Sequence, residues 1–382
     1  MVVQKRNYTE DTSLSGRRME IICKLQRIHK MLEEKDMEAL LLQKHPNFSW
    51  ITAGGKSFVA NCFDNGAVSI LITKDNNYAF CNVIEEPRML DEEKLPELGF
   101  SLEVFRWQDD FLENAVKKHV SSMARVVSDS PCGNVSVKPE WISPLRWQLT
   151  ENEIARYIHL GDTMSEALEE YMSTLVPGMT EYEIAGGISN VLWKHNIEQV
   201  MHLVSVDERA DKYRHGLPTG KKLKSKVIVS INGRYKGLVV TTSRMAHVKE
   251  PPEKLMRQYE DCCEMESLVV SKAAIGVDEL ELYNVLRQAY EEKGYPLMFD
   301  KHGQGGCQGY WPREYMITPA IHNRIKKNQA YCFNPVIDGT KSEDSFIVTE
   351  EGPLLITRPI SYPKRTYTFG DFIFERPGIL VI

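Results

Sequence analysis

Two histidines that begin glycine-containing segments are the side chains of this chain best suited to acid–base chemistry. His215 begins the run His-Gly-Leu-Pro, and His302 begins the run His-Gly-Gln-Gly. Because the ordinary pKa of histidine is about 6.5, its ring can take up or release a proton at neutral pH. The alternative for each is an ordinary loop histidine with a structural role. No Cys-x-x-Cys pair occurs, so a zinc knuckle is not indicated.

Composition and charge exclude several classes of function. The 382 residues carry 47 Lys and Arg against 53 Asp and Glu, a net charge of -6, and no long block of one sign. A nucleic-acid surface is therefore not expected. No apolar run approaches the roughly 18 residues of a membrane span, and the first residues lack the apolar core of a signal peptide. With eight scattered cysteines and no disulfide framework, we expect a cytoplasmic protein.

The first part of the chain alternates between helical and extended patterns. Residues 1–17 are polar and are expected to form a loose arm. Residues 18–148 are expected to form an α/β domain, since its apolar spacing switches between the periods of helices and strands. Helices are predicted at 18–35 and 109–124, and strands at 39–42, 68–72, 78–83 and 125–128.

A second domain is predicted over residues 149–357, followed by a tail at 358–382. Its first helix begins at the capping-box pattern of Thr150 and Glu153 and is expected to end at Pro177-Gly178. The same cap pattern, Thr180 and Glu183, begins the next helix.

This layout returns further along the chain. Helices are predicted at 253–274 and 279–293, and strand-like sequence follows each helix pair, at 227–231 and at 330–333. The repetition indicates an internal duplication. The alternative is an α+β domain that contains two unrelated helix pairs.

Short motifs along the second domain resemble, in order and spacing, a known catalytic domain. It is the pita-bread domain shared by aminopeptidase P, proline dipeptidase, methionine aminopeptidase and creatinase. Residues 18–148 resemble the N-terminal domain of that family more loosely. The resemblance implies an α/β N-terminal domain and an α+β pita-bread C-terminal domain. The motifs are Leu149–Ile154, Val176–Glu181, His215–Pro218, Leu223–Val229, His302–Gly305, Phe333–Pro335, Ser342–Ser345 and Val348–Gly352.

The resemblance also implies five ligand positions. In the family, two aspartates, one histidine and two glutamates hold two divalent metal ions that activate a water molecule. Aligning Tyr235-Lys236-Gly237 with the matching run of the family places these positions on Ser230, Thr241, Gly306, Asn334 and Glu343.

Only the glutamate of this set keeps the required type of ligand. Hard dications need charged oxygen ligands, and the other four positions offer neutral side chains or none. We therefore expect no metal and no cofactor. Other acids nearby lack the family spacing and are expected to be loop residues: Asp207, Asp211, Asp338 and Asp344.

The resemblance assigns roles to further residues. His215 matches a substrate-contacting histidine of the peptidases, and it resembles the general acid/base of creatinase, which hydrolyses a carbon–nitrogen bond without metal. His215 and Glu343 are therefore predicted to be catalytic. The predicted substrate-binding residues are Ser230, Thr241, His302, Trp311, Arg313 and Asn334.

Some of these side chains have simpler alternatives. Arg313 could bind a carboxylate or phosphate, or pair with an acid such as Glu314. Trp311, with Tyr310, could line the pocket or only pack. Arg244 is expected to be buried, with Glu343 accepting its charge.

Three functions follow as hypotheses. The first is a metal-independent hydrolase of a carbon–nitrogen bond in a small polar substrate. The second is a non-catalytic relative that binds a peptide or protein in the old cleft, and the third is residual Xaa-Pro peptidase activity. The expected ligand is a small molecule or peptide, and the resemblance implies a homodimer.

Overall fold

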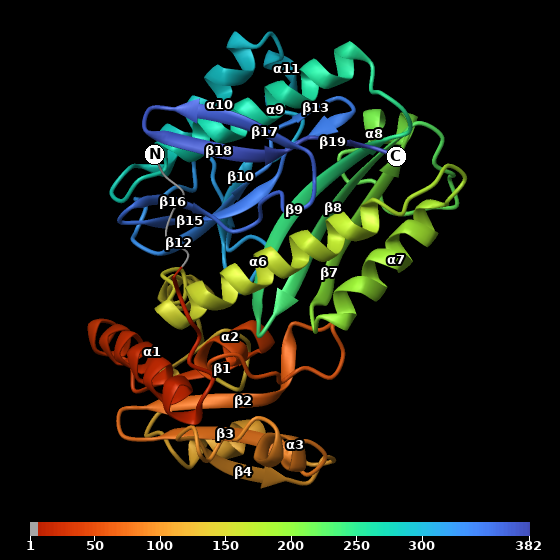
Figure 1. The fold of residues 1–382 in the computed structure, drawn as a ribbon. Helices are drawn as coiled ribbons and strands as arrows, with labels where there is room; N and C mark the ends of the chain where they lie inside the picture. Colours follow the sequence, from red (N-terminus) through yellow and green to blue (C-terminus); the bar gives the residue numbers. More distant parts are fainter. Residues whose placement is uncertain (1–6) are drawn as a thin grey trace. The chain divides into compact units, whose positions relative to one another are not determined.

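The computed structural model describes residues 7–382, which form two compact units (Figure 1). One unit, called the N-terminal unit, contains Thr9–Asn152 together with Lys236–Leu238. The other, called the C-terminal unit, contains Glu153–Tyr235 and Val239–Ile382. No helix within residues 7–382 is both long and apolar enough to cross a membrane.

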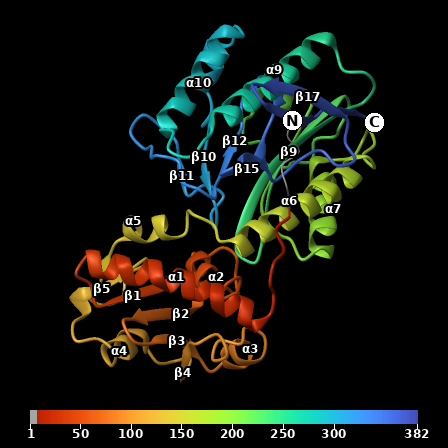
Figure 2. The same cartoon turned by 60° about the vertical axis from the view of Figure 1, so that its left-hand side comes forward.

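A mixed six-stranded sheet forms the centre of the N-terminal unit, in the order β4-β3-β2-β1-β5-β6. The buried strand β1 pairs antiparallel with β2 and parallel with β5. Figure 2 shows α1 and α2 packed beside this sheet. The strands are β1 (Ala39–Lys44), β2 (Asn65–Thr73), β3 (Asn77–Asn82), β4 (Ser101–Phe105), β5 (Val126–Ser128) and β6 (Ser136–Val137). The helices are α1 (Leu14–Glu34), α2 (His45–Ile51), α3 (Glu86–Asp91), α4 (Leu112–Lys117) and α5 (Pro139–Ile142).

Two predictions for this unit need correction. The first helix begins at Leu14 rather than residue 18, because the Ser13 hydroxyl accepts a hydrogen bond from Gly16 N and caps it. The end of the predicted arm is therefore helical, and residues 1–6 lie outside the described part. The helix predicted at 109–124 is shorter and covers only α4, Leu112–Lys117. The chain turns after α4, and the His119 ring stacks on the Tyr78 ring with their centroids 3.8 Å apart.

The C-terminal unit repeats one plan twice, as the sequence predicted. Two helices precede the strands of each half, and the nine-stranded sheet has the main order β11-β10-β12-β15-β9-β8-β7. In Figure 1, α6 and α7 lie alongside β7–β9, and α9 lies against β17 and β18. The first half contains α6 (Glu151–Met172), α7 (Glu181–Lys194), β7 (Glu198–Val206), α8 (Glu208–Lys212), β8 (Lys226–Tyr235) and β9 (Leu238–His247). The second contains α9 (Glu253–Lys272), α10 (Glu279–Glu292), α11 (Pro296–Phe299), β10 (Gly305–Gln308), β11 (Tyr315–Met316), β12 (Gln329–Phe333), β13 (Val336–Ile337), β14 (Thr340–Lys341), β15 (Asp344–Thr349) and β16 (Gly352–Leu355).

The helix boundaries in this unit test the cap predictions. The capping box of Thr180 and Glu183 is present, with hydrogen bonds in both directions. The first helix, however, ends at Met172 and not at Pro177. The hydroxyls of Ser173 and Thr174 bond back to the carbonyls of Glu170 and Tyr171, which favours leaving the helix at this point.

The last 25 residues form ordered strands that join the core. Strands β17 (Lys364–Phe369) and β18 (Phe372–Pro377) form a hairpin, and β19 (Ile379–Val381) pairs parallel with β9. Arg376 of β18 is fully buried. Its Nη1 lies 3.2 Å from Glu266 Oε1 and 3.3 Å from Asp344 Oδ2.

Replacing this arginine should therefore destabilise the unit. We predict that Arg376→Gln lowers the free energy of unfolding by about 3–5 kcal/mol, because two buried carboxylates lose a counter-charge. Arg365→Gln on the same hairpin is the matched control. Its partner Glu260 is 3.4 Å away and both side chains are nearly half exposed, so a change below about 1 kcal/mol is expected. Equal losses in urea unfolding would contradict this assignment.

Candidate functional site

The five positions aligned with metal ligands lie on or beside neighbouring strands of the large sheet. Two are on β8 and β9, one is on β10, and the others follow β12 and precede β15. All five residues are buried. In order along the chain they are Ser230, Thr241, Gly306, Asn334 and Glu343.

A lysine that the sequence analysis did not select lies among them. Lys341 Nζ is 2.7 Å from Glu343 Oε2 and 3.3 Å from Ser230 Oγ. Ser243 donates to Glu343 Oε2 at 2.6 Å, and Ser230 Oγ is 2.6 Å from Ser243 Oγ. Since the Ser243 proton points to Glu343, Ser230 must donate to Ser243. Lysine, two serines and glutamate thus form a closed ring of hydrogen bonds, here called the Lys341 ring.

A signal for this lysine was present in the sequence. Lys341 and Glu343 are two residues apart, and side chains at that spacing in an extended chain point to the same side. The turn between β13 and β14 contains Gly339, whose φ of 84° is readily adopted by glycine. This short hairpin delivers the ammonium group to the glutamate.

Glu343 has a second cationic neighbour. Arg313 Nη2 lies 3.5 Å from Glu343 Oε1. Burial alone raises the pKa of Glu343, but Lys341 and Arg313, with hydrogen bonds from Lys341 and Ser243, leave this pKa below its ordinary value. The carboxylate is therefore ionised and held by two cations.

The expected pairing of Arg244 with Glu343 is wrong. Arg244 Nε lies 2.8 Å from Glu169 Oε1, and its Nη1 lies 3.2 Å from Asp344 Oδ1. Alternate side chains of a strand point to opposite faces, so Ser243 faces the Lys341 ring and Arg244 faces away from it. Asp344 is likewise a buried strand residue and not the loop residue that was expected.

In this chain, two of the five positions aligned with metal ligands are closed to a bound molecule. Thr241 is 1% exposed, and its hydroxyl accepts from Gln308 Nε2 at 2.6 Å. A side chain at Gly306 would press its Cβ against the carbonyl oxygen of Tyr315 on the paired strand β11. Gly306 therefore has no room for the histidine of the family, and the Thr241 hydroxyl is already occupied by Gln308.

The two histidines lie together at the site. The rings of His215 and His302 meet edge to face, with centroids 5.3 Å apart. Asn334 Nδ2 lies 3.0 Å from His302 Nε2. Burial, followed by the charge of Lys341, lowers the pKa of His302 to about 3, so this ring is neutral at physiological pH. Its Nε2 can therefore accept the hydrogen bond from the Asn334 amide.

Trp311 and Arg313 lie in the turn after β10, and both are half-buried. Tyr310 beside them is buried, and its hydroxyl donates to Glu153 Oε1 at 2.6 Å. Tyr310 therefore packs against α6, which agrees with the packing role that the sequence analysis gave as its simpler alternative.

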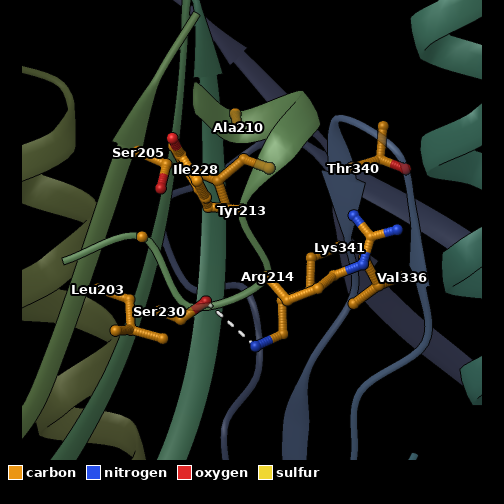
Figure 3. Close-up of a pocket in the computed structure, with 11 residues that line it drawn as sticks. Leu203, Ser205, Ala210, Tyr213, Arg214, Ile228, Ser230, Val336, Thr340 and Lys341 are labelled. Atoms are coloured by element: carbon orange, nitrogen blue, oxygen red, sulfur yellow. Dashed lines mark hydrogen bonds between the residues drawn. The ribbon is translucent and has the colours of Figure 1, made fainter. Parts of the chain in front are cut away.

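A narrow pocket begins at the Lys341 ring (Figure 3). Its cavity volume is about 20 Å³, which is room for about one water molecule. Ser230 is the predicted site residue among those that line it. The lining residues are Leu203, Ser205, Ala210, Tyr213, Arg214, Gly216, Ile228, Ser230, Val336, Thr340 and Lys341.

Known proteins resemble this chain over most of its length. Residues 155–350 match metallopeptidase family M24. An Xaa-Pro dipeptidase of Pyrococcus horikoshii is 23% identical over 358 residues, which cover 88% of this chain and 97% of the relative. Among solved structures, an Xaa-Pro dipeptidase from Bacillus anthracis (TM-score 0.74, 19% identity) covers 95% of this chain and 100% of its own. Dipeptidase PepE from Mycobacterium ulcerans (TM-score 0.76, 16% identity) covers 95% and 98%.

The fold and the family match together define the class of protein. The chain belongs to metallopeptidase family M24, with an α/β N-terminal domain and a curled-sheet C-terminal domain of the pita-bread type. Both the predicted family and the predicted fold class are confirmed. Within residues 7–382, however, no three His, Cys, Asp or Glu side chains are grouped as a metal ion would need.

The closed position at Gly306 can be tested by substitution. We predict that Gly306→Ala lowers the free energy of unfolding by about 1–3 kcal/mol, because the added methyl group has no space beside β11. Gly186→Ala, in the middle of α7 with open space around its Cβ, is the control. It should be neutral or stabilising by up to about 1 kcal/mol. An unchanged melting temperature for Gly306→Ala would show that β11 can move aside.

Proposed function

We propose that this M24 protein works without metal ions and binds a peptide in its pita-bread pocket without cleaving it by a two-metal reaction. The observation that carries the proposal is the position of Lys341. Its ammonium group contacts Glu343 and Ser230, which are two of the five positions aligned with metal ligands. The Lys341 ammonium group therefore lies beside two of the positions that would have to bind the metal ions of the family.

The chemistry of the donor set supports the same proposal. Two dications would find one carboxylate, Glu343, and its two oxygens already receive Lys341, Ser243 and Arg313. The remaining positions offer two hydroxyls, one amide and no side chain. Stripping water from two dications is costly unless several carboxylates replace it, so these residues do not fit the pair of ions.

Unsatisfied polar groups near the site favour a bound ligand. Asn334 Oδ1 is buried and has no hydrogen-bond partner among the described residues, and the same holds for Arg214 Nε. Such groups in native proteins call for water or a ligand as partner. Since the relatives are Xaa-Pro dipeptidases by name, a peptide is the ligand class we propose. We also expect a homodimer in solution, as the family resemblance implies.

A second candidate function rests on the histidine pair. His215 is exposed and touches the neutral His302, which Asn334 orients. An exposed histidine in this position could remove a proton from water as it adds to a carbonyl or amidine carbon. The same proton would then pass to the nitrogen that leaves. This would hydrolyse a carbon–nitrogen bond without metal.

Metal analysis tests the first proposal. We predict that the purified protein contains well under one divalent ion per chain and that EDTA leaves its melting temperature unchanged. It should not cleave Ala-Pro or Gly-Pro under conditions in which the Pyrococcus horikoshii Xaa-Pro dipeptidase does, with or without added Mn²⁺. Chelator-sensitive cleavage by this chain would overturn the proposal and restore the peptidase alternative.

Substitution of His215 separates the two candidates. If a library of small amides and ureas yields no turnover, and His215→Ala binds peptide as the parent does, the binding function stands. If a substrate is found, the histidine hypothesis predicts that His215→Ala reduces kcat by roughly 100-fold or more, while EDTA has no effect. His195→Ala, on the C-cap of α7, is the control and should keep full activity.

A further inference from the structure

Five charged side chains form a buried cluster on the face of β9 and β15 that points away from the Lys341 ring. Each of these side chains is at most 1% exposed. One arginine lies 2.8 Å and 3.2 Å from its two acids, and the other lies 3.2 Å and 3.3 Å from its two acids. The cluster, here called the Glu266 cluster, consists of Glu169, Arg244, Glu266, Asp344 and Arg376.

The charges of this cluster do not balance. Two guanidinium groups carry two positive charges, whereas three ionised carboxylates would carry three negative charges. An uncompensated charge away from water is costly, and a buried carboxyl group avoids this cost by taking up a proton. The cluster should therefore hold one proton.

Two of the three acids are well supplied with hydrogen-bond donors. Besides its arginine, Glu169 accepts from the backbone amides of residues 360–362 through Oε2. Asp344 contacts both arginines and accepts from the hydroxyls of Thr242 and Thr357. Donors of this kind stabilise the ionised form of a carboxyl group. These two acids are therefore poor acceptors for the extra proton.

Glu266 has fewer donors. Its Oε1 accepts from Asp344 N at 2.8 Å and lies 3.2 Å from Arg376 Nη1, an arginine that it shares with the Asp344 carboxylate. Its Oε2 contacts the Ser342 hydroxyl, which can accept a hydrogen bond as well as donate one. Burial has the largest effect on the pKa of Glu266 and raises it to about 7, although Arg376 opposes this shift. Glu266 is thus the acid suited to carry the proton.

The other groups around Glu266 do not supply the missing positive charge. Burial raises the pKa of the Cys263 thiol on α9 and of the Cys332 thiol on β12 to about 12, so both thiols are neutral at pH 7. Burial also raises the pKa of Tyr367 on β17. The charged side chains on the elements packed against α9 face other partners: Lys293 of α10 with Asp261 and Glu264, Lys341 of β14 with Glu343, Arg365 of β17 with Glu260, and Lys364 of β17 with Glu375.

Glu266 touches the segment that carries the carboxylate of the Lys341 ring. Its two oxygens contact Ser342 and Asp344, the residues on either side of Glu343. Glu343 itself accepts from Ser243 and pairs with Lys341 on the opposite face of the sheet. A change in the charge of Glu266 therefore acts on the chain directly before and after Glu343.

We propose that the Glu266 cluster binds one proton, with Glu266 as the group that takes it up, and that loss of this proton weakens the hold of α9 on the segment around Glu343. With the proton bound, the cluster is neutral. Without it, one negative charge stays buried and the C-terminal unit is less stable. This inference goes beyond the proposed function and does not depend on peptide binding.

Unfolding measured against pH tests the proton site. Because the pKa of Glu266 is about 7 in the folded chain against 4.5 for an ordinary glutamate, its proton stabilises the fold fully below about pH 4.5. That contribution is lost as the pH rises through 7. Glu266→Gln keeps the size of the side chain and stays neutral throughout. The unfolding equilibrium constant of the parent, divided by that of Glu266→Gln, should therefore rise roughly 30-fold to 100-fold between pH 5 and pH 8.

The ratio removes the effect of other groups. Burial lowers the pKa of His202 to about 4 and that of His302 to about 3, so their protonation destabilises the fold in acid. Both histidines are present in parent and variant and cancel in the ratio. Glu264→Gln, on the same helix, is the matched control. Its side chain is 43% exposed and pairs with Lys293, so the corresponding ratio should change by less than about threefold.

NMR of the folded protein measures the proton directly, whether or not the variant folds. With carbon-13 glutamate, the side-chain carboxyl resonance of Glu266 is assigned through bonds to its own backbone. It should titrate between about pH 6 and pH 8. The side-chain nitrogen resonance of Lys341 should shift with the same midpoint in the parent, and this shift should be absent from Glu266→Gln.

The outcomes separate the two parts of the proposal. A ratio that stays constant from pH 5 to pH 8, or a Glu266 carboxyl group that stays ionised down to pH 5, would overturn the proton site. Titration of Glu266 without any response at Lys341 would support the proton site and overturn its link to the Lys341 ring. Since neither measurement uses a peptide, a failure of the proposed peptide binding would leave both results unchanged.

Discussion

The ion pair between Lys341 and Glu343 is the interaction on which the site depends. A buried carboxylate requires a counter-charge, and here the ammonium group at 2.7 Å provides it without an ion from solution. The pair also fixes the direction of the neighbouring hydrogen bonds, because Ser243 must donate to Glu343 and Ser230 must donate to Ser243. Removing Glu343 alone would leave Lys341 buried without its carboxylate, and removing Lys341 alone would leave Glu343 with Arg313 as its remaining counter-charge, so either change should destabilise the site.

Strand alternation separates this ring from a second set of buried charges. Glu343 and Ser243 face the Lys341 ring, whereas Asp344 and Arg244 face the helices α6 and α9. Asp344 also accepts hydrogen bonds from Thr242 and from two further residues, Thr357 and Arg376. The strands β9 and β15 therefore carry polar networks on both faces.

The sequence predicted the fold and family well because their signals are periodic or have fixed spacing. The helix caps, the repeated helix pairs and the motifs from residue 149 to residue 352 are of this kind. Side-chain partners were harder to predict. Lysine is not a metal ligand in this family, so the motif gives no signal for Lys341. The partners of Arg244, Glu169 and Asp344, depend on which face of β9 it occupies, and its motif does not encode that face. The short α4 and the early end of α6 depended on contacts of His119, Ser173 and Thr174 that the apolar pattern does not encode.

The buried arginine of β18 has a consequence for biosynthesis. Glu266 and Asp344 emerge from the ribosome well before Arg376, which donates to both of them. During that interval the nascent chain must either protonate these acids or keep them in contact with water. Burial raises the pKa of Glu266 to about 7 even with the arginine present, so its charge is costly to enclose early. Closure of the C-terminal unit should thus wait until Arg376 has left the ribosome, which leaves its unfinished core accessible to chaperones.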